Sequence, residues 1–184
     1  MKNQVLETIE KRRSHRKYQS TPLTKEQIDT LIAAALQSPS AVNRQPWHFS
    51  VVQDQALLDR IHRAAKAVAM QKEKRSPRYD DEQYHIFYHA PCVIVLSQDT
   101  ASPYAPIDCG IAVQTISLAA ESMGLGSVIL AMPRDAFIGA EKSDLEKALD
   151  FPDGYGFAIA IALGIPEDDK PAHEIKEGKV SYIE

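Results

Sequence analysis

One long apolar segment constrains the fold of this chain more than any other feature. The run PIDCGIAVQTISLAAESMGLGS, residues 106–127, carries apolar or small residues on nearly every face of a helix. A helix without a polar face is stable only when other elements surround it. We therefore expect this helix to be buried on all sides, either in the centre of one domain or in an interface between subunits. Gly124 is expected to end it as a C-cap glycine.

The remaining segments predict a mixture of helices and strands. Thr24 and Gln27 form a T-x-x-Q capping box, and the helix that they begin must end near Gln37, because Ser38 precedes Pro39. We expect further helices at 3–12, 54–72, 82–89 and 141–149, and strands at about 47–53, 91–99, 127–131 and 157–164. Strict alternation of strand, helix and strand is missing, so the fold class is α+β, and residues 1–184 are predicted to form a single domain.

The overall charge argues against a partner that is a nucleic acid. The net charge is −4 and the sequence pI is about 5.9, whereas nucleic-acid-binding domains are usually basic. The longest apolar run, FAIAIALGI at 157–165, is too short to span a membrane. The N-terminal segment lacks the apolar core of a signal peptide, and Cys92 and Cys109 lack metal-type spacing. We therefore expect a reduced, cytoplasmic protein that binds neither nucleic acid nor membrane.

A basic cluster near the N-terminus is the first candidate binding site. Five of the seven residues in KRRSHRK, which is residues 11–17, are Lys or Arg. The first three close a helix, where cations favour the negative end of the dipole. Ser14 and Arg16 lie beyond that helix, and a turn that offers a hydroxyl, N–H groups and guanidinium groups suits phosphate. Helix capping and the binding of one small anion both remain possible at this stage.

A polar loop is the second candidate. SPSAVNRQPWHF, residues 38–49, brings together the hydrogen-bonding side chains of Ser38, Ser40, Asn43 and Gln45. Asn and Gln amides carry both donors and acceptors, which suits the edge of a heterocycle. A plain connection between a helix and a strand has the same composition, so the loop alone decides nothing.

Other chemical motifs are weak or missing in the sequence. His85 and His89 have a spacing that suits a metal on a helix, but no further ligand accompanies them, so a structural role is favoured. We find no Walker loop, G-x-S-x-G motif or dinucleotide fingerprint. We therefore expect no metal and no catalytic side chain, and we attribute the chemistry to an organic cofactor.

The order and spacing of RRSHRKY, SPSAVNRQPWHF and DCGIAVQTISLAAESMGLGS resemble the FMN-dependent nitroreductase family, from about residue 4 to the C-terminus. The resemblance implies an α/β sandwich whose mostly antiparallel central sheet is flanked by helices, in a domain-swapped homodimer with two FMN molecules at its interface. It also implies an enzyme that takes hydride from NADH or NADPH and reduces a nitroaromatic, quinone or similar acceptor by a ping-pong mechanism. A flavin-binding sensor or carrier with little turnover is the alternative.

The resemblance also implies a set of cofactor-binding residues. Arg12, Arg13, Ser14 and Arg16 match the family's FMN-binding turn, with Arg12 assigned to the phosphate and Arg16 to electrostatic support of the flavin. The loop from the other subunit corresponds to Pro39, Ser40, Ala41 and Asn43, with Gln45 a further candidate. Backbone that passes the flavin ring corresponds to Ile129, Leu130 and Ala131. A basic residue near the C-terminus serves the phosphate in the family, and here Lys176 and Lys179 are alternatives.

Two departures from the family leave the acceptor open. The chain is short between residues 72 and 90, where longer members carry extra helices over the substrate pocket. It also has Ala131 and Met132 where some relatives place Glu-Gly. The choice between NADH and NADPH is open as well. The C-terminal KVSYIE is expected to pair with the sheet edge of the partner subunit.

Overall fold

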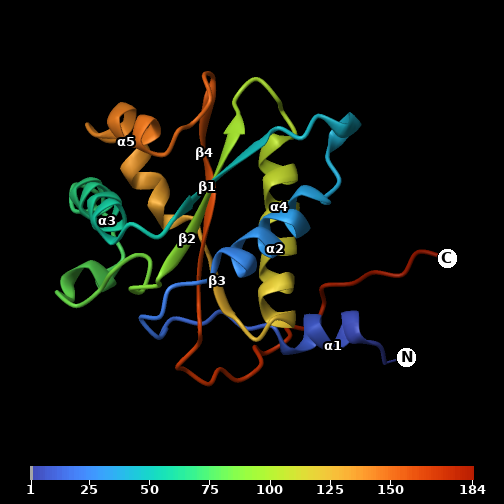
Figure 1. Ribbon diagram of the computed structural model, residues 1–184. Coiled ribbons are helices and arrows are strands. Elements are labelled where there is room, and N and C mark those ends of the chain that lie inside the picture. Colours follow the sequence, from blue (N-terminus) through green and yellow to red (C-terminus); the bar gives the residue numbers. More distant parts are fainter. Residues whose placement is uncertain (1) are drawn as a thin grey trace.

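The computed structural model describes residues 2–184, and this part of the chain contains five α-helices and a four-stranded antiparallel sheet (Figure 1). The strand order is β1-β2-β4-β3, which leaves β1 and β3 at the edges. The strands are β1 (Trp47–Val52), β2 (Cys92–Asp99), β3 (Gly126–Leu130) and β4 (Tyr155–Gly164). The helices are α1 (Gln4–Lys11), α2 (Lys25–Leu36), α3 (Gln55–Ala69), α4 (Ala105–Ser122) and α5 (Lys142–Ala148). Short 3₁₀ turns are η1 (Ala41–Asn43), η2 (Pro77–Asp80) and η3 (Met132–Phe137).

Local sequence signals account for several of these boundaries. The capping box at the start of α2 is confirmed: Thr24 Oγ1 accepts from the Gln27 N–H at 3.2 Å, and Gln27 Oε1 accepts from the Thr24 N–H at 2.9 Å. The helix ends with Gln37 as its C-cap. After α4, Gly124 takes a left-handed φ of +73°, as expected for a C-cap glycine.

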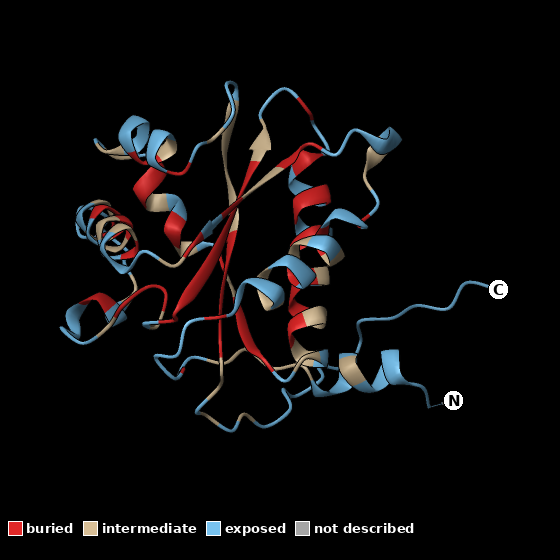
Figure 2. Cartoon of the chain, viewed as in Figure 1, coloured by how far each residue is buried: buried red, intermediate tan, exposed pale blue. Residues whose placement is uncertain are grey.

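The sheet separates two hydrophobic cores, which confirms the α+β class and the sandwich arrangement. Successive residues of a strand face opposite sides, so Val93 and Val95 of β2 pack toward α3, whereas Ile94 and Leu96 pack toward α2 and α4. Figure 1 shows α3 and α5 on one side of the sheet and α2 and α4 on the other. Figure 2 shows that buried residues line the strands and the helix faces turned toward them.

Helix α4 is not buried on all sides within one chain. Ala112, Ile116 and Ala120 are fully buried against the sheet side, but Ile107 and Ile111 are 63% and 38% exposed. The expectation of complete burial is therefore wrong for the isolated chain. The alternative, burial of this face in an interface between subunits, stays a prediction.

Residues 82–89 do not form the expected helix. They form a series of turns, in which Tyr88 and His89 both take left-handed backbone angles. His85, Ile86 and Phe87 are all buried, at 6%, 0% and 0% exposure. Consecutive residues of a helix point about 100° apart, so a surface helix cannot bury three in a row. An irregular chain can, and burial of these three side chains outweighs the helical spacing of the segment.

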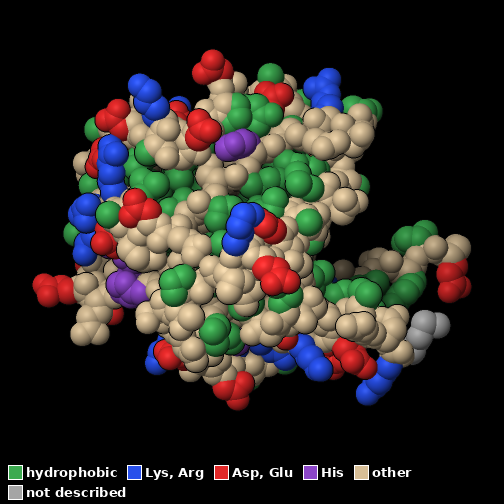
Figure 3. All heavy atoms as spheres, viewed as in Figure 1, with side chains coloured by type: hydrophobic (Ala, Val, Ile, Leu, Met, Phe, Trp, Pro, Cys, Tyr) green, Lys and Arg blue, Asp and Glu red, His purple; other side chains and the backbone are tan. Residues whose placement is uncertain are grey.

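The C-terminal tail is extended and exposed. Residues 171–184 form no helix or strand and are exposed throughout. Figure 3 shows the tail standing away from the body with hydrophobic side chains on it, and Ile175, Tyr182 and Ile183 are 84%, 87% and 92% exposed. The strand expected at 179–184 is thus not paired within the chain, and its pairing with a partner stays a prediction. Among the helices of residues 2–184, none combines the length and the apolar character that crossing a membrane requires.

Candidate functional site

The basic turn lies directly against edge strand β3. The N–H of His15 donates to the Ser127 carbonyl at 3.0 Å, and Ser14 forms an isolated parallel bridge with Ser127. Gly126 makes this approach possible, because an added Cβ would lie 2.8 Å from the Cβ of Pro166 and 3.1 Å from that of His15. The turn is therefore a fixed part of the sheet's edge and not a free continuation of α1.

A single carboxylate, that of Asp168, holds this turn in place. Asp168 Oδ1 lies 2.7 Å from His15 Nδ1, its Oδ2 accepts from the Arg16 N–H at 3.0 Å, and Lys170 Nζ lies 3.3 Å from Oδ2. Burial alone would raise the pKa of Asp168, but the hydrogen bonds from Arg16, His15 and Lys170 outweigh it, and the pKa is lowered. The Asp168 side chain itself is only 8% exposed. The carboxylate thereby links the turn to the segment that follows β4.

The charges of the turn are only partly compensated. Within residues 2–184, Arg12 and Arg16 form no ion pair with a carboxylate. The guanidinium carbon of Arg16 lies 5.8 Å from the centre of the Tyr88 ring, within the range of a cation–π contact. Arg13 differs, because it donates to the carbonyls of Glu10, Arg12 and Lys170 at 2.6, 3.0 and 3.2 Å. The turn thus presents two guanidinium groups that are available to an anion.

The polar loop has an unusual backbone. Val42, Asn43 and Gln45 take left-handed φ values of 48°, 56° and 49°. Inside the loop, Ser40 Oγ accepts from the Gln45 N–H at 2.9 Å, and Gln45 Nε2 donates to Asn43 Oδ1 at 3.1 Å. The amide groups of Asn43 and Gln45 are therefore adjacent and exposed, as a site for a heterocycle requires.

The two candidate segments lie at opposite ends of α4. The loop contacts the first turn of this helix, where the Ala41 N–H donates to Asp108. The basic turn contacts Ser127, just beyond the other end of the helix. The 18 residues of α4 span about 27 Å. Figure 1 shows η1 near one end of the helix and the chain after α1 near the other. One small ligand cannot contact both segments of the same chain.

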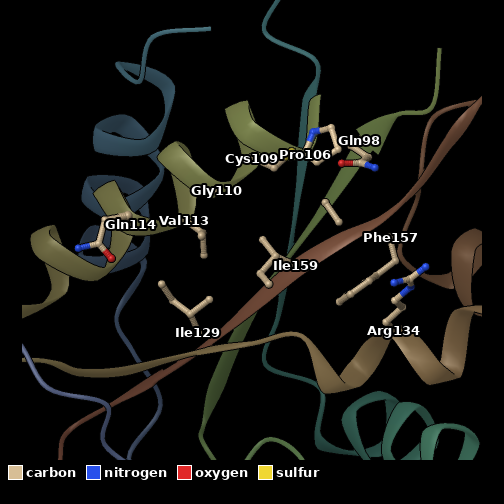
Figure 4. A pocket seen from close by; sticks show the side chains of 11 residues that line it. Gln98, Pro106, Cys109, Gly110, Val113, Gln114, Ile129, Arg134, Phe157 and Ile159 are labelled. Atoms are coloured by element: carbon tan, nitrogen blue, oxygen red, sulfur yellow. The ribbon is translucent and has the colours of Figure 1, made fainter. Parts of the chain in front are cut away.

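A cavity of about 570 Å³ lies between α4 and the sheet (Figure 4). In Figure 4, Ile129, Ile159 and Val113 point into it, and Arg134 lies beside Phe157. Of the three residues predicted beside a flavin, the side chain of Ile129 lines this cavity. Leu130 faces the opposite core at 5% exposure, and Ala131 is exposed at the start of η3. Strand alternation places the first two on opposite faces, so only the backbone of Leu130 is available at the edge.

A second hollow, of about 450 Å³, lies beside Arg16. Its walls include Tyr84 and Tyr88, and the Tyr84 hydroxyl lies 3.3 Å from the sulfur of Met132. The hydroxyl of Tyr88 accepts from Arg78 at 2.9 Å. The segment 77–89 therefore connects the basic turn to the residues that follow β3.

The two histidines pack within a cluster of rings. His85 stacks between His62 and His89, with ring centres 4.5 and 4.8 Å apart, and its Nδ1 accepts from the Phe87 N–H at 3.2 Å. Burial, followed by the charges of His62 and His89, lowers the pKa of His85 to about 4, so it is neutral at pH 7. No group of three or more potential metal ligands occurs in residues 2–184.

The C-terminal lysines are not brought to the turn within one chain. Lys176 and Lys179 are exposed, and no hydrogen bond or ion pair in the described structure connects either to residues 12–16. Their role toward a phosphate stays a prediction.

Comparison with known proteins identifies the family. Residues 9–165 match the model of the nitroreductase family. The chain belongs to the nitroreductase family. The crystal structure of a nitroreductase with bound FMN from Desulfitobacterium hafniense has a TM-score of 0.94 and 34% identity, with 100% of both chains covered. A protein provisionally named NADH dehydrogenase/NAD(P)H nitroreductase, from Methanothermobacter thermautotrophicus, is 39% identical over 131 residues, which are 69% of this chain and 60% of that protein. Iodotyrosine deiodinase from Thermotoga neapolitana is 26% identical over 187 residues, 97% of each chain.

Sequence reasoning did not single out several residues of this nitroreductase that shape the site. Asp168 contacts His15, which lies about 150 residues earlier in the chain, and nothing near Asp168 in the sequence signals that contact. Tyr84 and Tyr88 fell within the segment 82–89, which the sequence predicted only as a helix. Asp108 had a signal, because it is an acid in the first turn of a largely apolar helix, whose other acid, Glu121, lies at the opposite end.

We expect Asp168→Asn to destabilise the nitroreductase by about 1–3 kcal/mol at pH 7, because charge-assisted bonds to the turn are lost. The folded pKa of Asp168 is lowered, so its stabilisation is present above the ordinary aspartate pKa and disappears as the pH falls through the lowered value. The difference between wild type and variant should therefore shrink below about pH 4. Urea unfolding at several pH values measures this.

Asp169→Asn is the matched control, since the neighbouring Asp169 is exposed and forms no ion pair in the described structure. Equal stability of wild type and Asp168→Asn at pH 7 would contradict the role given to this carboxylate.

Proposed function

We propose that this nitroreductase is an FMN-dependent enzyme that oxidises NADH or NADPH and reduces a small organic acceptor. One observation carries the proposal: two guanidinium groups, those of Arg12 and Arg16, remain uncompensated on a turn that Asp168 fixes against β3. That arrangement suits a phosphate and a negatively charged ring. The FMN in the similar structure from D. hafniense and the NAD(P)H in the name of the M. thermautotrophicus relative support it.

The chain's residues would bind and orient the cofactor. Arg12 and Ser14 contact the phosphate side, and Arg16 stabilises the negative charge that accumulates on reduction. When bound, FMN supplies two-electron transfer between the nicotinamide and the acceptor. Neither cysteine competes as a nucleophile, because burial raises the pKa of both Cys92 and Cys109 to about 12. Both are free and buried, which is consistent with a cytoplasmic location.

We further propose a homodimer in which each site uses two chains. The turn and the loop lie at opposite ends of α4, so a two-fold axis that crosses this helix near its middle brings the loop of one copy to the turn of the other. Exposed apolar side chains on α1 and α4 support this face as the interface. They are Val5 and Ile9 on α1, and Ile107 and Ile111 on α4. The exposed C-terminal tail is the segment proposed to cross over to the partner.

The acceptor is proposed only as a class. Nitroaromatics and quinones fit a cavity with an apolar floor and the carboxamides of Gln98 and Gln114 at its edge. The relatives differ in the reactions that their names state, from nitroreductase to deiodinase, so the family does not choose among acceptors. Since the sequence contains no separate nucleotide fingerprint, donor and acceptor are proposed to use the same pocket in turn, which is ping-pong kinetics.

The function is tested by the absorbance spectrum of the purified protein with FMN. We expect bound, yellow FMN that NADH or NADPH bleaches without oxygen, and that a nitroaromatic or a quinone then reoxidises. Initial rates at several fixed donor concentrations should give parallel double-reciprocal plots. A protein that cannot be loaded with FMN would refute the proposal. Yellow protein that neither nicotinamide bleaches would favour a flavin-binding sensor or carrier.

Two substitutions in the turn should impair different properties, namely FMN affinity and the midpoint potential of bound FMN. Arg12→Ala removes a charge-assisted contact, and we expect FMN affinity to fall by about 1.5–3 kcal/mol with little change in the midpoint potential of bound FMN. Arg16→Ala should retain FMN, but the potential should fall and nicotinamide oxidation should slow, because a cation near the reduced ring is lost. Titration with FMN and a redox titration separate the two. An unchanged midpoint potential in Arg16→Ala would contradict the electrostatic role given to Arg16. Phosphate binding would then be the only role left to the cluster.

Mixed dimers test whether one site uses two chains. Arg12→Ala damages the turn and Asn43→Ala damages the loop, so each homodimer has two defective sites. A dimer of one Arg12→Ala chain and one Asn43→Ala chain, purified with two different tags, should recover tight FMN binding at about half of its sites.

The matched control pairs a wild-type chain with a chain that carries both substitutions. If each site uses two chains, this dimer has no intact site and should bind FMN weakly. If each chain forms its own site, the two mixed dimers should give the opposite results.

A further inference from the structure

A buried carboxylate in α4 lacks an evident structural purpose. Asp108 lies in the first turn of this helix, is 3% exposed, and is the only Asp or Glu among residues 2–184 that is fully buried. Its Oδ1 accepts from the Ala41 N–H at 3.2 Å, whereas its Oδ2 has no hydrogen-bond partner. Burying a carboxylate with incomplete hydrogen bonding costs free energy, so its presence requires an explanation.

The Ala41 N–H belongs to the loop with the strained backbone. Left-handed angles are rare for residues other than glycine, and for a β-branched residue such as Val42 they are a true outlier. Packing does not impose this shape on Val42, because its side chain is 87% exposed. Something else must hold the backbone of the loop.

Hydrogen bonds leave one candidate for that anchor. The bonds of Ser40, Asn43 and Gln45 remain inside the loop. Between residues 40–45 and the rest of the described chain, the bond from Ala41 to Asp108 is the only hydrogen bond. Asp108 lies in the first turn of α4, and a carboxylate oxygen at that end of a helix is a strong acceptor for a backbone N–H.

We propose that Asp108 is a positioning residue that holds the loop 40–45 in the shape required to complete the FMN site of the partner subunit. It does not contact the cofactor; it acts through the backbone of Ala41 on Asn43 and Gln45. This inference rests on the proposed FMN-dependent dimer, but its structural half, the anchoring of the loop, does not depend on a bound cofactor.

The bond can be removed from either side. Asp108→Leu removes the acceptor and keeps the number and branching of the side-chain heavy atoms. Ala41→Pro removes the donor at the first residue of η1, a position that proline favours, and Ser40 before it is extended, with φ −140° and ψ 155°. Asp108→Asn keeps a carbonyl oxygen as acceptor and is the conservative variant. Thr115→Val is the matched control, because Thr115 lies on the same helix and bonds only to Ser38, outside residues 40–45, and to a carbonyl of its own helix.

Two measurements are made on each full-length dimeric variant: amide hydrogen exchange of residues 42–45 without cofactor, and the dissociation constant for FMN. In Asp108→Leu and Ala41→Pro we expect exchange to quicken and FMN affinity to fall, each by about tenfold. The double variant should be no worse than either single one, since both remove the same bond. Asp108→Asn should stay near wild type, and Thr115→Val should be unchanged.

The outcomes separate this inference from the proposed function. If the wild type binds FMN but the single variants match it in exchange and affinity, Asp108 is not the anchor. Effects that add in the double variant, or equal effects in Thr115→Val, would also overturn the inference. If the wild type binds no FMN, the proposed function fails, and the exchange data alone decide whether Asp108 anchors the loop. Should Asp108→Leu fail to fold, Ala41→Pro and Asp108→Asn provide the same comparison.

Discussion

The length of helix α4 fixes the distance between the polar loop and the basic turn, and the rest of this nitroreductase depends on that distance. It packs one face on the sheet, and its two ends contact the two segments that are proposed to bind the cofactor. Because a helix of 18 residues is stiff and about 27 Å long, the loop and the basic turn cannot approach each other within one chain. Two features that are otherwise unrelated follow from this: an apolar helix face left uncovered in the monomer, and a site proposed to need a second copy.

The same kind of hydrogen bond holds both segments in place. Each is irregular backbone on the surface, where it would otherwise be mobile, and each is held by a carboxylate with little exposure that accepts a backbone N–H. Asp168 accepts from Arg16 in the turn, and Asp108 accepts from Ala41 in the loop. A charged acceptor forms stronger bonds than a neutral one, and shielding from water strengthens them further. This arrangement leaves the guanidinium groups of the turn and the amides of the loop free to face a ligand.

Backbone proximity at the sheet edge is the other requirement. Gly126 lets the turn lie against β3, and the serine hydroxyls of Ser117 and Ser127 pair with each other at 3.0 Å beneath it. The segment 77–89 then approaches from the other side through Tyr88 and Tyr84, and Tyr84 lies next to Met132. Residues from distant parts of the chain therefore meet at β3 and just beyond its end, where the cofactor site is proposed.

The sequence by itself determined most of the elements and the family. Capping signals, apolar periodicity and the Ser-Pro step are local, so the capping box of α2 and its end near Gln37 could be read directly. The motifs RRSHRKY and SPSAVNRQPWHF carried the family resemblance, which the match over residues 9–165 confirms. Tertiary structure decided the rest, because it depends on contacts between distant residues. Burial of His85, Ile86 and Phe87 overrode the helix expected at 82–89. Only the folded chain shows that Asp168 and Asp108 accept backbone N–H bonds from the turn and the loop, and that α4 keeps those two segments apart.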